Sequence, residues 1–263
     1  MFETFIFDGI SCDEYGITCV SFEPARSMTA PAQITGLETE KSVLGDVYHI
    51  LAQPYTEPLS FTIQIANRDF SPIEPYQERA LKKWLCRKGR YKLFTIYDKR
   101  YADTWFYANL SNPQTIFISE VYGMEFTVTT NAPFGFSNIR IQSHTFTEND
   151  SIHFYVDHDE DLPIYPDLTF TALQSGSYVI ANRTDARTGM HPFTVNHIKA
   201  GETIHIKGAY PLIESSDRLH DASIYNDTNK EWLYLIDGRN TIQCNLPCEM
   251  KLQYREYRKV GIS

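Results

Sequence analysis

An acidic run in the second half of the chain has the residue types and the spacing of a cation-binding loop. Residues 157–161 place aspartate at every second position, as at the start of an EF-hand calcium loop. Such a loop needs glycine at its sixth position and a bidentate glutamate at its twelfth, where this chain has Leu162 and Leu168. An EF-hand is therefore excluded, and a solvated acidic loop is favoured over a looser cation site.

Pairs of cysteine and histidine residues in the same half have the chemistry of metal ligands. Cys244 and Cys248 are four positions apart, but the other cysteines lie far upstream, so two buried thiols are favoured over a zinc site. His197 and His205 flank a glycine-containing turn and could meet across a hairpin. No carboxylate spacing completes a triad or a metal shell around them, so we predict no metal site and no catalytic residue.

The sequence contains none of the motifs that mark common catalytic centres. It has no GxSxG elbow, HExxH helix, Gly-rich phosphate loop or dinucleotide fingerprint. We therefore expect no enzymatic activity and no cofactor, although a glycosidase carboxylate pair stays open because a distance in space defines it. Tyr178, Tyr210 and Tyr225 are candidate exposed aromatics for sugar stacking, whereas Trp232 is expected in the core of an apolar strand.

Length and composition favour two β-rich domains. The 263 residues suffice for two cores of about 130 residues each, and 17 tyrosines and 16 phenylalanines favour strands over helix bundles. The net charge of -9 argues against a broad basic face for nucleic acid, although an acidic channel would let DNA pass without binding it. Five cysteines at no disulfide spacing suit a reducing cytoplasm. No apolar run reaches about 18 residues, so no membrane anchor is expected.

Only one stretch predicts a helix. In residues 70–85, apolar side chains recur at three- and four-residue spacing on one face, and basic side chains hold the other. The helix could begin with a capping box that opens at Ser71, or at Pro75. Trp84 is expected in the core, and Gly89 is the expected left-handed C-cap.

Strand patterns fill the rest of the chain. Residues 59–65 alternate apolar and polar types, and Asp8-Gly9 predicts a hairpin turn near the start. The composition changes to polar, loop-rich residues after Phe136, so we expect two domains, residues 1–137 and residues 138–263. The second shows short strands, turns and no helix signal, as in a sandwich or jelly roll. The expected fold is mainly β, with one helix and a β-sandwich-like architecture in the first domain.

Residues 31–51 show no regular apolar period that would bury them against a single core. Two short apolar arms surround Gly-marked bends without a strict period, which indicates an extended hairpin arm; a mobile surface loop is the alternative. A protruding arm can satisfy the open edge strand of a neighbouring copy by strand addition. Identical head-to-tail contacts of this kind then close a ring.

Several short sequence motifs occur in a fixed order along the chain, and their order is more specific than any one of them. They are Phe-Asp-Gly at 7–9, Lys-Trp-Leu at 83–85, Gly-Met-Glu-Phe at 123–126 leading into Ala-Pro-Phe-Gly-Phe at 132–136, and Gly-Arg-Asn-Thr-Ile at 238–242. Together they resemble the distal tail proteins of siphophages that infect Gram-positive bacteria, part of the broad phage tail family. The resemblance covers nearly the whole chain and contains no catalytic signature.

This resemblance implies a structural virion protein at the tail tip, made in the cytoplasm of the host bacterium. In such proteins the N-terminal domain builds a hexameric ring, and the C-terminal domain is a galectin-like or carbohydrate-module-like sandwich. The implied partners are further copies of the chain, the tail tube protein, the tail hub or tail-associated lysin protein, and a receptor-binding or other baseplate protein. DNA would pass through the lumen without specific binding. The alternative is a carbohydrate-binding adhesin or glycosidase accessory module that acts through the second domain.

The arm supplies the residues that we expect between neighbouring copies. They are Ile34, Gly36, Leu37, Val43, Leu44, Val47 and Tyr48. If the ring is obligate, each contact between copies should bury on the order of 2,000 Å² or more.

Overall fold

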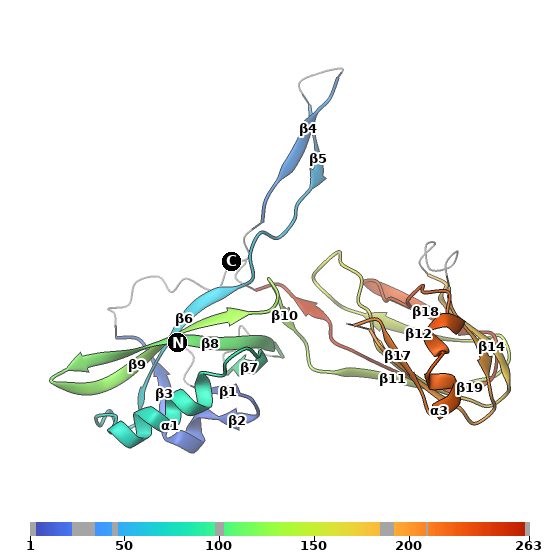
Figure 1. The fold of residues 1–263 in the computed structure, drawn as a ribbon. Coiled ribbons are helices and arrows are strands. Elements are labelled where there is room, and N and C mark those ends of the chain that lie inside the picture. Colours follow the sequence, from blue (N-terminus) through green and yellow to red (C-terminus); the bar gives the residue numbers. More distant parts are fainter. Residues whose placement is uncertain are drawn as a thin grey trace. The chain divides into compact units, whose positions relative to one another are not determined.

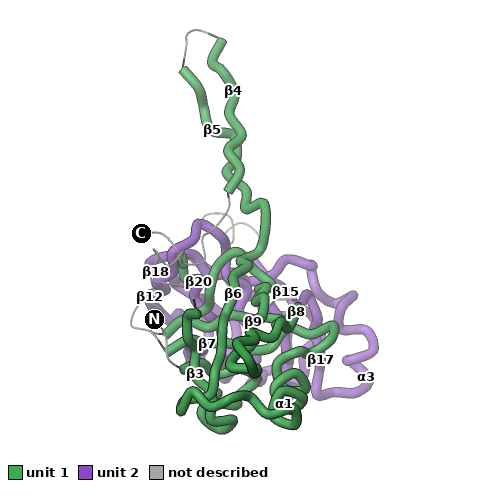
Figure 2. The backbone as a smooth tube through the Cα atoms, turned by 90° about the vertical axis from the view of Figure 1, so that its left-hand side faces the viewer, with its two compact units in different colours: residues 1–136, 258–263 green, residues 137–257 purple. Residues whose placement is uncertain are grey.

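The chain folds into two compact units that are both built mainly of strands (Figure 1). The computed structural model describes residues 4–22, 35–43, 47–97, 103–184, 192–208 and 210–260. One unit contains residues 1–136 together with 258–263, and the other contains residues 137–257 (Figure 2). The chain therefore returns to the first unit at its end, where Val260 packs into the first core. The domains expected from the sequence, residues 1–137 and 138–263, instead assign the end of the chain to the second domain.

A seven-stranded antiparallel sheet forms the body of the first unit. Its order is β2-β1-β7-β8-β9-β6-β3, so strands far apart in the sequence lie side by side. The strands of this sheet are β1 (Phe5–Phe7), β2 (Ile10–Ser11), β3 (Ile17–Val20), β6 (Ser60–Asn67), β7 (Lys92–Ile96), β8 (Phe106–Ile118) and β9 (Glu120–Thr130). The predicted alternation in residues 59–65 is confirmed, because Ile63 and Ile65 point into the core while Ser60 is exposed.

The first hairpin shows how local sequence sets this sheet. Asp8 and Gly9 join β1 to β2, and both have positive φ angles, 54° and 78°. Two successive residues with positive φ make the type I′ turn, whose twist matches that of the flanking strands. The turn predicted from Asp8-Gly9 is therefore confirmed.

The single long helix begins at Pro75, one of the two starts considered, and ends before the residue expected as its C-cap. α1 (Pro75–Leu85) starts with proline in its first turn, and its N-cap, Glu74, is extended and receives no side-chain cap. Because the proline ring disfavours a helical conformation at the preceding residue, the capping box at Ser71 does not form. The helix ends at Cys86, so the expected C-cap at Gly89 is wrong, although Gly89 has a positive φ of 67°.

Trp84 joins this helix to the sheet. Its side chain is buried, as predicted, and its ring stacks on Phe5 at 5.7 Å and on Tyr15 at 4.4 Å between ring centroids. The indole Nε1 donates a hydrogen bond to the backbone oxygen of Phe7 at 3.2 Å, so its polar atom is satisfied within the core. The helix therefore holds β1 and the short helix η1 (Cys12–Tyr15) in one apolar cluster.

Two antiparallel sheets form the second unit. One has the order β11-β19-β13-β16-β17 and the other β12-β18-β14-β15. The strands are β11 (Arg140–Phe146), β12 (Asp150–Val156), β13 (Asp167–Ala172), β14 (Gly176–Asn182), β15 (Phe193–Ile198), β16 (Thr203–Lys207), β17 (Leu212–Ser215), β18 (Gly238–Cys244) and β19 (Cys248–Tyr254). Residues from both sheets contribute to one buried cluster, so the predicted mainly β fold is confirmed.

Short helical turns in this unit were not predicted. α3 (Arg218–Asp221) and η3 (Ile224–Asp227) have four residues each, which is too short to show a helical period. The apolar strand expected around Trp232 is wrong: in residues 232–236 only Leu235 pairs, in an isolated bridge to Ile164. The remaining short strands are β10 (Gly135–Phe136) and β20 (Tyr257–Arg258). Among the described residues, no helix is both long and apolar enough to cross a membrane.

Candidate functional site

A separate two-stranded hairpin projects from the body of the first unit (Figures 1 and 2). β4 (Glu38–Lys41) pairs with β5 (Tyr48–Ala52), and the base closes where the Gly36 N–H donates to the Pro54 oxygen at 2.9 Å. All four side chains of β4 and the first four of β5 are exposed. An isolated two-stranded hairpin is only marginally stable in water, so contact with another surface would stabilise this arm.

Several of the residues expected at an interface lie on this hairpin arm. The exposed ones are Leu37, Val43, Val47 and Tyr48, whereas Gly36 is half-buried at the base. Ile34 and Leu44 lie outside the described residues. Large apolar side chains gathered on one projection are typical of a surface that binds another protein.

Two exposed apolar residues of the arm are absent from the set expected between neighbouring copies. Ile50 and Leu51 are 64% and 63% exposed and belong to the same strand as Tyr48. Ile50 lies opposite Thr39 and Tyr48 lies opposite Lys41, so these two apolar side chains point to one face of the hairpin. The period of two in residues 48–52 could have identified Ile50.

A second hairpin of the first unit also has an exposed apolar end. β8 and β9 pair as far as Ile118 opposite Glu120, but β7 pairs with β8 only up to Ala108. Phe117 and Ile118, near the turn, are 69% and 60% exposed. Proline is tolerated where a strand has no neighbour on one side, and β8 continues through Pro113.

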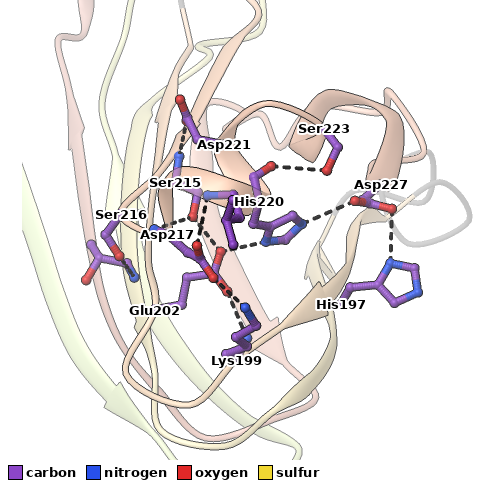
Figure 3. Close-up of polar contacts among 12 residues, drawn as sticks. His197, Lys199, Glu202, Ser215, Ser216, Asp217, His220, Asp221, Ser223 and Asp227 are labelled. Atoms are coloured by element: carbon purple, nitrogen blue, oxygen red, sulfur yellow. Dashed lines mark hydrogen bonds and ion pairs between the residues drawn. The ribbon is translucent and has the colours of Figure 1, made fainter.

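The second unit contains a buried histidine that lies between two carboxylates (Figure 3). The Nδ1 of His220 lies 2.6 Å from Glu202 Oε1, and its Nε2 lies 3.2 Å from Asp227 Oδ2. His220 and Glu202 are both buried. Each ring nitrogen therefore faces a carboxylate oxygen, one from Glu202 and one from Asp227. We refer to these three residues as the His220 clasp.

Further polar groups surround the clasp (Figure 3). Ser215 Oγ donates to Glu202 Oε1, and the Lys199 N–H donates to Glu202 Oε2 at 2.8 Å. The Lys199 ammonium bonds the carboxylate of Asp217, which lowers the pKa of Asp217 from its ordinary value. Asp217 also caps α3 by accepting from the Leu219 N–H at 3.0 Å.

The geometry of this cluster is structural rather than catalytic. A serine nucleophile would have to bond a free nitrogen of the histidine ring. Both nitrogens of His220 are occupied by carboxylates, and the hydroxyl of Ser223 bonds the backbone oxygen of His220 instead. The clasp therefore ties α3 and η3 to the start of β16, and sequence spacing could not reveal it because its members come from three elements.

Removing the imidazole should destabilise the second unit. We expect His220→Ala to lower the free energy of unfolding by about 1–3 kcal/mol, because the buried Glu202 carboxylate would lose its contact with the ring. The matched control is His197→Ala: this exposed ring bonds Asp227 Oδ1 at 3.0 Å, and its loss should cost less than about 1 kcal/mol. Chemical denaturation followed by circular dichroism measures both, and equal losses would contradict the clasp.

The acidic run is not the uniformly solvated loop that the sequence suggested. His158 and Glu160 are each only 6% exposed, and the Glu160 N–H donates to His158 Nδ1 at 3.3 Å. Burial lowers the pKa of His158. Asp157, Asp159 and Asp161 remain at the surface. Within the described ranges, no group of three His, Cys, Asp or Glu side chains is placed to hold a metal ion.

The cysteine pair and the histidine pair considered as metal ligands are arranged differently in the structure. Cys244 and Cys248 are buried free thiols, as expected, and their sulfur atoms are 3.7 Å apart. His197 and His205 do not meet, so the expectation of a hairpin pair is wrong. They lie on strands of different sheets, and His205 Nδ1 instead contacts Thr169 Oγ1 at 3.1 Å.

The candidate sugar-stacking aromatics are also separated by the fold. Tyr178 is fully buried, which contradicts its expected exposure; its hydroxyl donates to Pro247 at 2.8 Å, and burial raises its pKa to about 12. Tyr210 and Tyr225 are exposed. Trp232 is half-buried and stacks on Phe193 at 5.9 Å, so it borders the core.

Two family models match this chain, one over each half. A model described as a phage tail protein N-terminal domain matches residues 1–132, and a phage tail C-terminal domain matches residues 134–254. The chain belongs to the phage tail protein family. The family membership suggested by the sequence landmarks is thereby confirmed.

Relatives of this phage tail protein match it over almost their full length. It is 26% identical to the SPbeta prophage-derived uncharacterized protein YomH of Bacillus subtilis (strain 168), over 95% of this chain and 96% of the relative. Its fold is similar to that of SPP1 Dit (gp 19.1), described as a paradigm of the hub adsorption apparatus in phages that infect Gram-positive bacteria. That match has a TM-score of 0.67 at 11% identity and covers 97% of this chain and 99% of Dit.

A second solved structure shows the same fold. A chain of the phage P2 baseplate, in its activated conformation with Ca, matches with a TM-score of 0.57 at 8% identity, and each chain is covered completely. Such low identities show the fold alone. The family models and the fold together identify this chain as a structural component of a phage tail with a mainly β fold.

Proposed function

We propose that this phage tail protein is a distal tail subunit that forms a hexameric ring and joins the tail tube to the host-adsorption apparatus. The observation that carries the proposal is the exposed β4–β5 hairpin arm, on a chain whose whole fold is similar to a hub protein. The arm exposes large apolar side chains and has no neighbouring strand beyond its own hairpin among the described residues.

The arm suits contact with a second copy of the chain. Among the described strands of the seven-stranded sheet, β2 and β3 are outermost, and an edge strand is the kind of surface that accepts strand addition. When the arm of one copy lies on a different surface of the next copy, the contact is heterologous, and equal rotations close a ring. The exposed end of the β8–β9 hairpin adds apolar surface to the same unit.

The proposed role is geometric and requires no catalysis. One face of the ring would match the tail tube, and the other would match the tail hub and a receptor-binding or other baseplate protein. The net charge of -9 would help DNA to pass the lumen without binding, because like charges repel. A lumen lined by lysine and arginine would contradict this part of the proposal.

Assembly can be measured in solution. We expect light scattering after size exclusion, over a series of protein concentrations, to give a mass that rises towards six times that of the 30.4 kDa chain. A concentration series is needed because subunits of a ring can dissociate on dilution. The mass of a single chain at every concentration would overturn the proposed self-assembly.

A further inference from the structure

Two buried cysteines connect the two sheets of the second unit. Cys244 is the last residue of β18 and pairs with Ile180 in one sheet. Cys248 is the first residue of β19 and pairs with Ala172 in the other. Only residues 245–247 separate them, so the chain crosses from one sheet to the other between the two thiols.

The two sulfur atoms already lie side by side. The Cys248 thiol donates to Cys244 Sγ at 3.7 Å, and the Cys244 thiol donates to the Leu246 oxygen at 3.3 Å. The hydrogen bond from Cys248 lowers the pKa of Cys244 and raises that of Cys248, so Cys244 is the better nucleophile of the two. A disulfide needs an S–S distance of about 2.05 Å, which small side-chain rotations could provide.

The connecting loop holds this arrangement in place. The Asn245 side chain accepts from the Val179 N–H at 2.7 Å and donates to the Ser177 oxygen at 2.9 Å. The Pro247 oxygen accepts from the Tyr178 hydroxyl at 2.8 Å. Because the loop is fixed to neighbouring strands on both sides, the thiols stay neighbours in the folded chain.

We propose that Cys244 and Cys248 are an oxidation site that forms an intrachain disulfide and thereby ties the two sheets of the second unit together. The oxidant is a peroxide. The Cys244 sulfur attacks one peroxide oxygen, the O–O bond breaks, and a sulfenic acid and one water result. The Cys248 sulfur then attacks the Cys244 sulfur and displaces hydroxide, which leaves as a second water with the Cys248 proton. Two thiols and one hydrogen peroxide give one disulfide and two waters.

A phage tail protein offers a setting for this chemistry. Thiols are kept reduced in the bacterial cytoplasm, whereas disulfides persist outside cells. The site would therefore stay open during folding and close after release. Closure would limit separation of the two sheets at this corner, an effect independent of the proposed ring.

Peptide mapping tests the proposal on the folded full-length chain. After treatment with hydrogen peroxide and alkylation, we expect the tryptic peptide of residues 240–251 to lack two hydrogens and carry no alkyl group. Dithiothreitol should restore two alkylatable thiols. Free thiols should fall from five to three if the half-buried Cys86 and the other two cysteines stay reduced. A peptide that keeps two thiols, while the urea-unfolded chain is oxidised by the same treatment, would overturn the proposal.

Thermal unfolding supplies a second readout. Oxidation should raise the unfolding midpoint of the second unit by about 2–5 °C, a small rise because the closed loop is short. Cys248→Ser is the matched control, and its midpoint should not rise on oxidation. If that variant does not fold, the peptide map of the unaltered chain still decides the question. A disulfide that forms but leaves the midpoint unchanged would overturn the proposed tie between the sheets.

Discussion

Exchanging both Tyr48 and Ile50 for glutamate is expected to abolish self-assembly and to leave the subunit folded. The two side chains share one face of the hairpin arm and are 62% and 64% exposed. Substitutions at exposed positions usually change stability by less than about 0.5 kcal/mol. If the face is covered in the ring, each contact would instead bury two unpaired carboxylates, which costs several kcal/mol. We expect a monomeric mass at concentrations where the unaltered chain assembles.

A matched control separates lost contact from added charge. Leu219 is also exposed but lies in the second unit, so Leu219→Glu adds negative charge without touching the arm. This variant should assemble like the unaltered chain. Circular dichroism should show that all three proteins are folded. If the double variant assembles at the normal concentration, the arm face around Tyr48 does not lie between copies.

Replacing Trp84 by alanine should destabilise the first unit by about 3–5 kcal/mol. The indole is 2% exposed, stacks between Phe5 and Tyr15, and bonds the Phe7 oxygen. Its removal would leave a cavity where α1 meets the sheet and an oxygen without its donor. A typical domain has only about 5–15 kcal/mol of total stability, so this loss should be visible in urea unfolding followed by circular dichroism.

Two variants make this prediction specific. Trp84→Phe keeps an aromatic ring and loses the indole hydrogen bond, so its cost should be clearly smaller than that of alanine. Trp232→Ala removes a half-buried ring from the second unit and should leave the transition of the first unit unchanged. A Trp84→Ala cost of about 1 kcal/mol or less would contradict the anchoring role.

Local patterns predicted much of the fold because they report on local physics. The alternation in residues 59–65 and the turn at Asp8-Gly9 depend only on strand geometry and backbone sterics, and both are present in the structure. The apolar stripe of α1 placed Trp84 in the core for the same reason. The projecting hairpin was recognisable because its apolar residues had no period that a single core could use.

The errors arise where several signals compete or where contacts are distant. The capping box at Ser71 does not form, because Pro75 disfavours a helical conformation at the residue before it. Tyr178 was proposed as exposed although the alternation of its strand places it on the buried face. The His220 clasp unites residues that lie 7 and 18 positions from the histidine, and no spacing rule connects them.

Distant contacts also decide which apolar residues on the two hairpins of the first unit are exposed. Exposure of Phe117 and Ile118 depends on where the neighbouring strands end, and no short segment of sequence records that. Leu37, Val43, Val47 and Tyr48 could be named in advance because the arm itself lacks a core, whereas Ile50 and Leu51 were missed. Which of them touches a neighbouring copy depends on the assembly.

Averaged electron images of the purified full-length chain test the central claim most directly. The proposed function predicts particles with six-fold rotational symmetry, in which the β4–β5 hairpin of each subunit lies on the next subunit around the ring. Particles without rotational symmetry at concentrations well above those of dissociation, or a hairpin that lies against its own subunit, would contradict it.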